Sequence, residues 1–182
     1  MNKVMSQQSK TLSYVLRHAP EKAGLALGPG GWVNVEALLA GLAAMGESLS
    51  SDDLRAIVET SDKKRFTLSE DGRMIRAAQG HSVDVDLELQ PSAPPETLYH
   101  GTATRFLDAV LAEGLRPMAR VHVHLSGDVE TALKVGGRHG KPIVLAVDAK
   151  AMADAGRAFF KADSGVWLTD QVPPEFLSER VP

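Results

Sequence analysis

The chain has 182 residues, of which 43% are hydrophobic and 24% charged, and this is typical of a soluble globular protein with one ordinary domain or two small ones. The absence of cysteine excludes disulfides, thiolate chemistry and sulfur-ligated zinc, and without a long apolar run or a secretory signal we expect a cytoplasmic protein that does not cross a membrane. The net charge is −3 and neither half is basic, so a nucleic acid would be bound through a local patch and not through a broad cationic surface.

The first predicted helix spans residues 9–19, where apolar side chains recur at i, i+3, i+4 and i+7. At 100° per residue, Tyr14, Arg17 and His18 fall on the opposite, polar side. A guanidinium grips phosphate oxygens through paired N–H bonds, and an imidazole orients a group or moves a proton near neutral pH. Taken alone, an Arg-His pair on a helix is more often a solvated face than a site.

Two more helices and a hairpin are predicted after it. Asn34 caps a helix that runs to residue 42, and Ser50 or Ser51 caps the next one. Residues 64–68 and 74–77 form two strands around an Asp-Gly turn. Three helices followed by a hairpin are the order of a winged helix-turn-helix.

A boundary is predicted at residues 90–96, where three prolines prevent a helix or a central strand. We therefore expect an N-terminal lobe over residues 1–90, a linker over 91–97 and a C-terminal lobe over 98–182. Short strands and small helices alternate in the C-terminal lobe, which favours a compact α+β fold. The strands are expected at 98–102, 121–126, 143–147 and 166–169, and the helices at 106–113 and 129–136.

Several polar residues have common explanations when each is taken alone. His122 and His124 alternate with valines on one side of a strand, which is a spacing that two metal ligands can have, but no carboxylate motif accompanies them. We expect a solvated or hydrogen-bonded histidine face there and no metal site. Arg65 at a strand start and Arg120 in a loop are equally ambiguous.

A stronger signal comes from seven short motifs in a fixed order. They are Ser9-Lys10 with Leu12-Ser13 and Leu16-Arg17-His18, then Gly31-Trp32-Val33, Lys64-Arg65-Phe66, Ile75-Arg76-Ala77 with Gln79-Gly80-His81-Ser82, Tyr99-His100-Gly101-Thr102, Val123-His124-Leu125-Ser126 and Gly165-Val166-Trp167-Leu168-Thr169. Together they resemble the RNA 2′-phosphotransferase family of the Tpt1/KptA type. Two departures are Ala78 and Ser164, where the resemblance leads us to expect asparagine.

The resemblance implies an N-terminal winged-helix lobe for RNA and a C-terminal lobe of the ADP-ribosyltransferase fold that holds NAD. It implies removal of an internal RNA 2′-phosphate, as left at a tRNA-like splice junction, by a monomer that uses NAD as co-substrate and no metal. The 2′-phosphate attacks C1″ of NAD and expels nicotinamide, giving an ADP-ribosylated RNA phosphate. Attack of the ribose O2″ on phosphorus then yields 2′-OH RNA and ADP-ribose 1″,2″-cyclic phosphate.

The resemblance also assigns residues to these tasks. Arg17, Arg65 and Arg120 hold the phosphate, and His18 serves the second step by orienting the phosphate or assisting departure of the RNA 2′-oxygen. Preorganised guanidinium groups can stabilise charge on phosphoryl oxygens without a metal. The other assignments are His100, Gly101, Thr102, His124 and Ser126 to NAD, and Tyr14, Lys64, Arg76 and Gln79 to RNA or supporting contacts, with Arg76 alternatively bracing the hairpin.

Two alternatives stay open at this point. One is an enzyme that stops after the first step and adds ADP-ribose to terminal phosphates of nucleic acid. The other is a winged-helix DNA-binding regulator with a ligand-sensing second half, against which the acidic balance of residues 1–90 argues.

Overall fold

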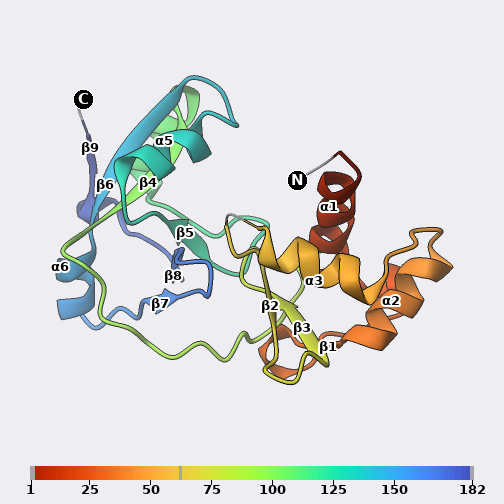
Figure 1. Cartoon of the computed structure of the whole chain (residues 1–182). Helices are drawn as coiled ribbons and strands as arrows, with labels where there is room; N and C mark the ends of the chain where they lie inside the picture. The colour runs from red at the N-terminus through yellow and green to blue at the C-terminus, as the bar shows by residue number, and fades with distance from the viewer. Residues whose placement is uncertain (1–2, 62, 181–182) are drawn as a thin grey trace. The chain divides into compact units, whose positions relative to one another are not determined.

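The computed structural model describes residues 3–61 and 63–180. Residue contacts divide the chain into two compact units, 1–89 and 90–182 (Figure 1). Both units contain helices and small antiparallel sheets, so the predicted α+β class is confirmed. The outermost residues of the two predicted lobes, 1–2 and 181–182, lie outside the described residues. None of the helices in the described ranges is both long enough and apolar enough to span a bilayer.

The first unit combines helices with a three-stranded antiparallel sheet in the order β1-β3-β2. Its elements are α1 (Lys3–Arg17), the 3₁₀ turns η1 (Pro20–Ala23) and η2 (Pro29–Gly31), β1 (Val33–Asn34), α2 (Val35–Ala44), α3 (Ser51–Glu59), β2 (Phe66–Leu68) and β3 (Met74–Ala77). The hairpin of β2 and β3 was predicted, whereas β1 is too short to show an alternating pattern.

Side-chain caps begin two of these helices at the predicted places. The Asn34 side chain accepts a hydrogen bond from the Ala37 N–H at 3.0 Å. Ser50 Oγ accepts from the Asp53 N–H at 3.1 Å, and the Asp53 carboxylate accepts from the Ser50 N–H, so Ser50 is the cap of α3 within a capping box. Helix α1 begins at Lys3, before the predicted start at residue 9, because residues 3–8 are mostly good helix formers and Met5 packs against the core.

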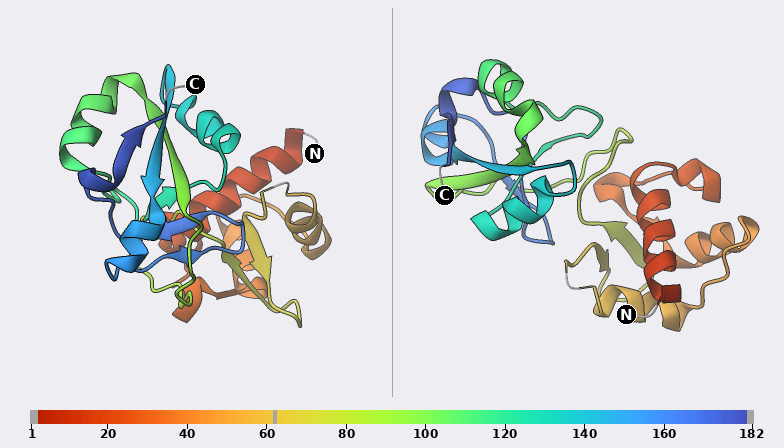
Figure 2. Two further views of the ribbon diagram at one scale, coloured as in Figure 1. Left: turned by 90° about the vertical axis from the view of Figure 1, so that its left-hand side faces the viewer. Right: turned by 90° about the horizontal axis from the view of Figure 1, so that it is seen from above.

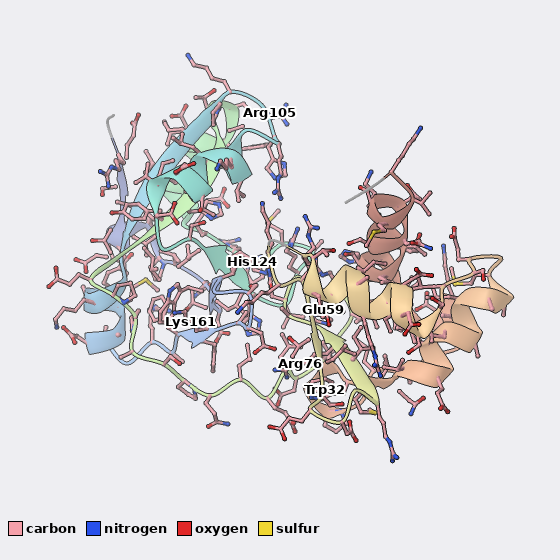
Figure 3. The ribbon with its side chains drawn as sticks, in the orientation of Figure 1. Trp32, Glu59, Arg76, Arg105, His124 and Lys161 are labelled. Atoms are coloured by element: carbon pink, nitrogen blue, oxygen red, sulfur yellow. The ribbon has the colours of Figure 1, made fainter. Side chains whose placement is uncertain are left out.

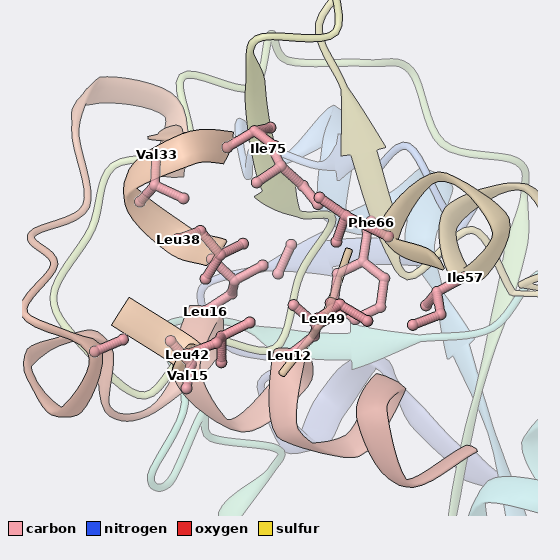
Figure 4. Packing of buried hydrophobic residues seen from close by; sticks show 14 residues of the cluster. Leu12, Val15, Leu16, Val33, Leu38, Leu42, Leu49, Ile57, Phe66 and Ile75 are labelled. Carbon is pink, nitrogen blue, oxygen red and sulfur yellow. The ribbon is translucent and has the colours of Figure 1, made fainter. Parts of the chain in front are cut away.

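The core of the first unit explains why α1 presents its polar face outward. Leu12, Val15 and Leu16 are fully buried and pack with residues of α2, α3 and the sheet, among them Leu38 and Phe66 (Figure 4). Burying these side chains contributes on the order of 2 kcal/mol each. The predicted apolar stripe is therefore confirmed, and the polar side of the helix carries the exposed side chains of this element.

The second unit contains two three-stranded antiparallel sheets, in the orders β4-β6-β9 and β5-β8-β7. Its elements are β4 (Thr97–Ala103), η3 (Thr104–Phe106), α4 (Leu107–Glu113), β5 (Val123–Leu125), α5 (Val129–Gly136), β6 (Pro142–Asp148), α6 (Ala149–Asp154), β7 (Phe160–Lys161), β8 (Trp167–Thr169), η4 (Pro174–Phe176) and β9 (Leu177–Glu179). β4 and β6 pair along their whole length and lie side by side in Figure 2.

A β-bridge joins the two sheets of this unit. The Tyr99 N–H donates to the Ser126 carbonyl at 2.9 Å, and the Ser126 N–H donates back to the Tyr99 carbonyl at 2.7 Å. This bridge joins β4 to the residue that follows β5. It therefore brings the ends of two sequence motifs, 99–102 and 123–126, next to each other.

Helix α5 approaches β4 so closely that the strand needs glycine at position 101. A Cβ on Gly101 would overlap the main-chain carbonyl of Ala132, and a Cβ on Gly136 would lie 2.6 Å from the Thr102 carbonyl oxygen. The two glycines thus let the helix and strand backbones touch. This contact is a structural reason for glycine at position 101, which the resemblance assigned to NAD.

Some features of the second unit were not predicted from the sequence patterns. Helix α6 is capped by Asp148, whose carboxylate accepts from the Ala151 N–H at 2.9 Å, but it is too short to show helical periodicity. The segment predicted as a linker contacts the second unit, because Pro91 forms a β-bridge with Phe160 and the Ser92 N–H donates to the Phe159 carbonyl at 2.8 Å.

Candidate active site

Arg17 and His18 lie at the carboxyl end of α1, where main-chain carbonyls lack helical partners. The Arg17 carbonyl accepts from the Ser82 N–H at 2.9 Å and from the Val83 N–H at 3.4 Å. His18 is exposed, and its Nδ1 lies 2.8 Å from Ser82 Oγ in a hydrogen bond. One short segment therefore fixes both the helix end and the imidazole ring.

Arg65 is held by the same segment from its other end. The Arg65 carbonyl accepts from the Ala78 N–H at 2.9 Å, and its own N–H donates to Ser61 Oγ at 3.4 Å. Residues 78–83, which follow β3, thus bond to the main chain at Arg65 and at Arg17. We call residues 78–83 the clasp segment.

The clasp segment is itself anchored in the first unit. His81 is almost fully buried. Its ring packs beside Gly31, because a Cβ added to that glycine would lie 3.6 Å from His81 Nε2. Ser82 was not among the predicted site residues, although it ends the Gln79-Gly80-His81-Ser82 motif. Only the fold shows that its hydroxyl meets His18, because the two residues are far apart in the sequence.

The residues predicted to face RNA divide into exposed groups and structural ones. Tyr14 and Lys64 are exposed, and Gln79 is half-buried. The Arg76 guanidinium stacks on Trp32, 4.6 Å from the centre of that ring system, and Arg76 Nη1 donates to the Gly30 carbonyl at 3.4 Å (Figure 3). These contacts support the alternative in which Arg76 braces the hairpin against the 28–32 loop.

A basic and aromatic group surrounds Tyr14 on the exposed side of α1. The Lys22 ammonium lies 5.0 Å from the centre of the Tyr14 ring, and the rings of Tyr14 and His18 are 6.3 Å apart. The hydrogen bond between Lys22 and the Tyr14 hydroxyl raises the pKa of Lys22, so the lysine stays cationic. This side of the helix is thus suited to an anionic ligand with flat rings.

In the second unit, the predicted NAD residues gather around the bridge between β4 and β5. His100 Nδ1 lies 3.1 Å from the carbonyl oxygen of His124, and because a carbonyl only accepts, Nδ1 carries the proton. Burial lowers the pKa of His100, which favours the neutral ring with Nε2 as an acceptor. Ser126 lies at the bridge itself, and Thr102 is buried on the same strand as His100.

Arg120 belongs to the second unit, unlike the other three residues of the predicted catalytic set. It is exposed at the end of a turn in which its N–H donates to the Pro117 carbonyl at 3.1 Å. Met118 in this turn has a φ of 57° and is 87% exposed. The turn therefore presents Arg120 to solvent on irregular backbone.

His122, which directly precedes β5, and His124 within the strand show the predicted alternation. Val123 and Leu125 are buried while His122 and His124 are half-buried, and the His122 ring contacts Phe160 with ring centres 5.8 Å apart. Within residues 3–61 and 63–180, no group of three or more metal-ligating side chains comes together.

The chain is similar over nearly its whole length to proteins that share one name. The sequence model of a family described as "RNA 2'-phosphotransferase, Tpt1 / KptA family" matches residues 3–171. A "Probable RNA 2'-phosphotransferase" of Agrobacterium fabrum is 62% identical over 170 residues, covering 93% of this chain and 91% of the relative. Another of that name, from Hahella chejuensis, is 58% identical over 178 residues, covering 98% and 96%.

Proposed function

The chain belongs to the RNA 2′-phosphotransferase family of the Tpt1/KptA type, and from this premise we propose that it is an NAD-dependent enzyme that removes an internal 2′-phosphate from RNA. In this proposal residues 1–90 are a winged-helix lobe that binds RNA, and residues 98–182 are an ADP-ribosyltransferase-like lobe that binds NAD. The substrate class is RNA with a 2′-phosphate, such as a tRNA-like splice junction. The names of the relatives support the transferase chemistry.

The proposed reaction has two balanced steps. An oxygen of the RNA 2′-phosphate forms a bond to C1″ of NAD while the bond to nicotinamide breaks and takes its electron pair to the nicotinamide nitrogen. The ribose O2″ then loses its proton and bonds to phosphorus, while the bond from phosphorus to the RNA 2′-oxygen breaks and that oxygen takes up a proton. The products are nicotinamide, 2′-OH RNA and ADP-ribose 1″,2″-cyclic phosphate.

The observation that carries the proposal is the clasp segment. Its bonds to the carbonyls of Arg17 and Arg65 and its hydroxyl contact to His18 fix the backbone that carries two arginines, and one imidazole ring, with a single six-residue stretch. Fixed cationic groups stabilise charge that builds on phosphoryl oxygens and cost no reorganisation during the reaction. We assign Arg17, Arg65 and Arg120 to the phosphate and His18 to the second step.

The second unit offers groups suited to the co-substrate. The neutral His100 ring presents Nε2 as an acceptor, which fits a ribose hydroxyl, and the Thr102 and Ser126 hydroxyls can donate or accept. His124 adds an imidazole from the neighbouring strand. We propose that these side chains hold NAD and that Gly101 contributes by admitting α5 to the strand.

A 2′-phosphorylated oligonucleotide incubated with NAD and a metal chelator tests the proposal, with mass detection of both products. We expect 2′-OH RNA and ADP-ribose cyclic phosphate in equal amounts, and none with Arg17→Ala. A matched control is Arg73→Ala, because Arg73 is an exposed arginine on the hairpin turn outside the predicted site. No phosphate loss at any enzyme concentration contradicts the proposal, and a stable ADP-ribosylated RNA from the unaltered protein favours the enzyme that stops after the first step.

A further inference from the structure

Helix α1 carries a polar stripe that leads away from His18. Gln7, Thr11, Tyr14 and His18 are spaced four, three and four residues apart, so they lie along one side of the helix. Tyr14 is 43% exposed, and its ring lies 6.3 Å from that of His18. At about 1.5 Å per residue the stripe from Gln7 to His18 is roughly 16 Å long.

A shallow groove of about 360 Å³ opens beside the far part of this stripe. It lies between α1 and the connection from α2 to α3, and its lining residues are Gln7, Lys10, Thr11, Tyr14, Met45 and Glu47. We call it the α1 groove. It is built entirely within the first unit.

The chemistry of the α1 groove matches a nucleobase with phosphates beside it. Bases of single-stranded RNA stack on exposed aromatic rings, and neighbouring cations follow the backbone. Tyr14 supplies the ring, while Lys10 and Lys22 supply cations on either side of it in the sequence. Glu47 would repel a phosphate in the groove itself, but its carboxylate can accept hydrogen bonds from the amino group of a base.

We propose that the RNA strand next to the 2′-phosphate runs along α1, with one base stacked on Tyr14, the following base in the α1 groove and its phosphates beside Lys10 and Lys22. The proposal rests on the proposed function for the position of the 2′-phosphate at His18. The stripe is long enough for about three to five nucleotides at stacked to extended spacing. In this arrangement, helix α1 binds the nucleotides that follow one another away from the reacting phosphate.

Paired substrates test this reading of the groove. One is a dinucleotide that carries the 2′-phosphate on the ribose at its internal linkage. The others add four nucleotides without a 2′-phosphate, on the 5′ side or on the 3′ side. We expect the extension on one side to lower KM by about tenfold or more, which is the effect of at least one stacked base. No advantage from either extension overturns the proposal.

Substitutions of residues that line the α1 groove sharpen the test. The quantity compared is the ratio of the KM for the dinucleotide to the KM for the extended substrate. Tyr14→Ala and Lys10→Ala should bring the ratio of dinucleotide to extended substrate close to one, whereas Tyr14→Phe, which keeps the ring, should retain it. Lys141→Ala is the matched control, since Lys141 is an exposed lysine of the second unit outside the predicted site. An unchanged ratio in Tyr14→Ala overturns the proposal.

A binding measurement separates this proposal from the proposed function. Fluorescence anisotropy of the labelled, extended 2′-phosphorylated RNA needs no turnover, and we expect Tyr14→Ala to weaken binding by about tenfold while Tyr14→Phe does not. If the unaltered protein binds this RNA through Tyr14 but releases no phosphate, the proposed function fails and the groove proposal stands. Equal binding by the unaltered protein and Tyr14→Ala overturns the groove proposal, whatever the activity.

Discussion

The two units place their predicted site residues by different means. In the first unit, Arg17, His18 and Arg65 stand at the ends of elements and are held by the clasp segment, mostly through main-chain bonds. In the second unit, His100 and Thr102 stand within β4, which pairs with β6 along its whole length, is bridged to Ser126 through Tyr99 and is covered by α5. We therefore expect that removing the Arg65 side chain costs the fold of the first unit little, whereas the predicted site of the second unit shares residues with its core.

The largest expected effect is that of Gly101→Ala on the second unit. The new methyl group would overlap the Ala132 carbonyl, so α5 must move away from β4. We expect a loss of more than about 3 kcal/mol in the free energy of unfolding. Gly127→Ala is the control, because nothing lies within 4 Å of a Cβ at that position. Urea denaturation of both variants gives the comparison, and equal stability would show that helix and strand separate easily.

Arg65→Ala should act on the chemistry and not on the fold. The main-chain bonds of Arg65 to Ser61 and Ala78 do not involve its guanidinium, so thermal unfolding should change little. Loss of a charge contact to the transition state is expected to lower kcat by about 10²–10³-fold. The measurement is single-turnover release of the 2′-phosphate, with Arg120→Ala in parallel. Near-normal rates in both variants would refute their assignment.

Ser82→Ala removes the hydroxyl from His18 but keeps the main-chain bond to Arg17. We expect the second step to slow by about three- to tenfold, the effect of one neutral hydrogen bond, so that the ADP-ribosylated RNA accumulates. Ser82→Thr should restore the ratio of the two step rates. Ser92→Ala, an exposed serine of the other unit, serves as control. If the intermediate does not build up, the hydroxyl does not position the ring for the second step.

The smallest expected effect is a pH dependence that belongs to the second unit. Because burial lowers the pKa of His100 below its ordinary value near 6.5, the unfolded chain binds a proton more readily than the folded one. Stability from the neutral ring is therefore present above that value and falls as the pH drops toward the lowered folded pKa. His100→Gln should flatten the fall in unfolding free energy between about pH 7 and pH 5. An unchanged slope would show that other groups cause it.

Sequence patterns predicted many of the helices, caps and turns because these features depend on residues that are close together in the sequence. Caps at Asn34, Ser50 and Asp128 bond to main-chain groups three residues away, and the hairpin turn lies within a short stretch. The apolar stripe of α1 likewise follows from spacing alone. These features could be predicted before any contact was known.

Long-range contacts could not be predicted in this way. The bond of Ser82 to His18 and the Tyr99–Ser126 bridge join residues with no local pattern that links them. Gly101 looked like a place for a ligand, and only the fold shows the α5 backbone there. The predicted site residues follow from the resemblance of the ordered motifs to a family, while the contacts that support them are seen only in the structure.

In the clasp segment, the number of residues between its two main-chain bonds is constrained, and the types of side chain do not reveal this constraint. Ala78 and Ser82 each use a main-chain N–H, so many side chains could serve at these two bonds. Deleting or inserting one residue between them would shift one bond out of register and pull Arg65 or Arg17 with it. A protein that keeps all four predicted catalytic residues would thus lose the arrangement proposed to hold the phosphate through a change of spacing alone.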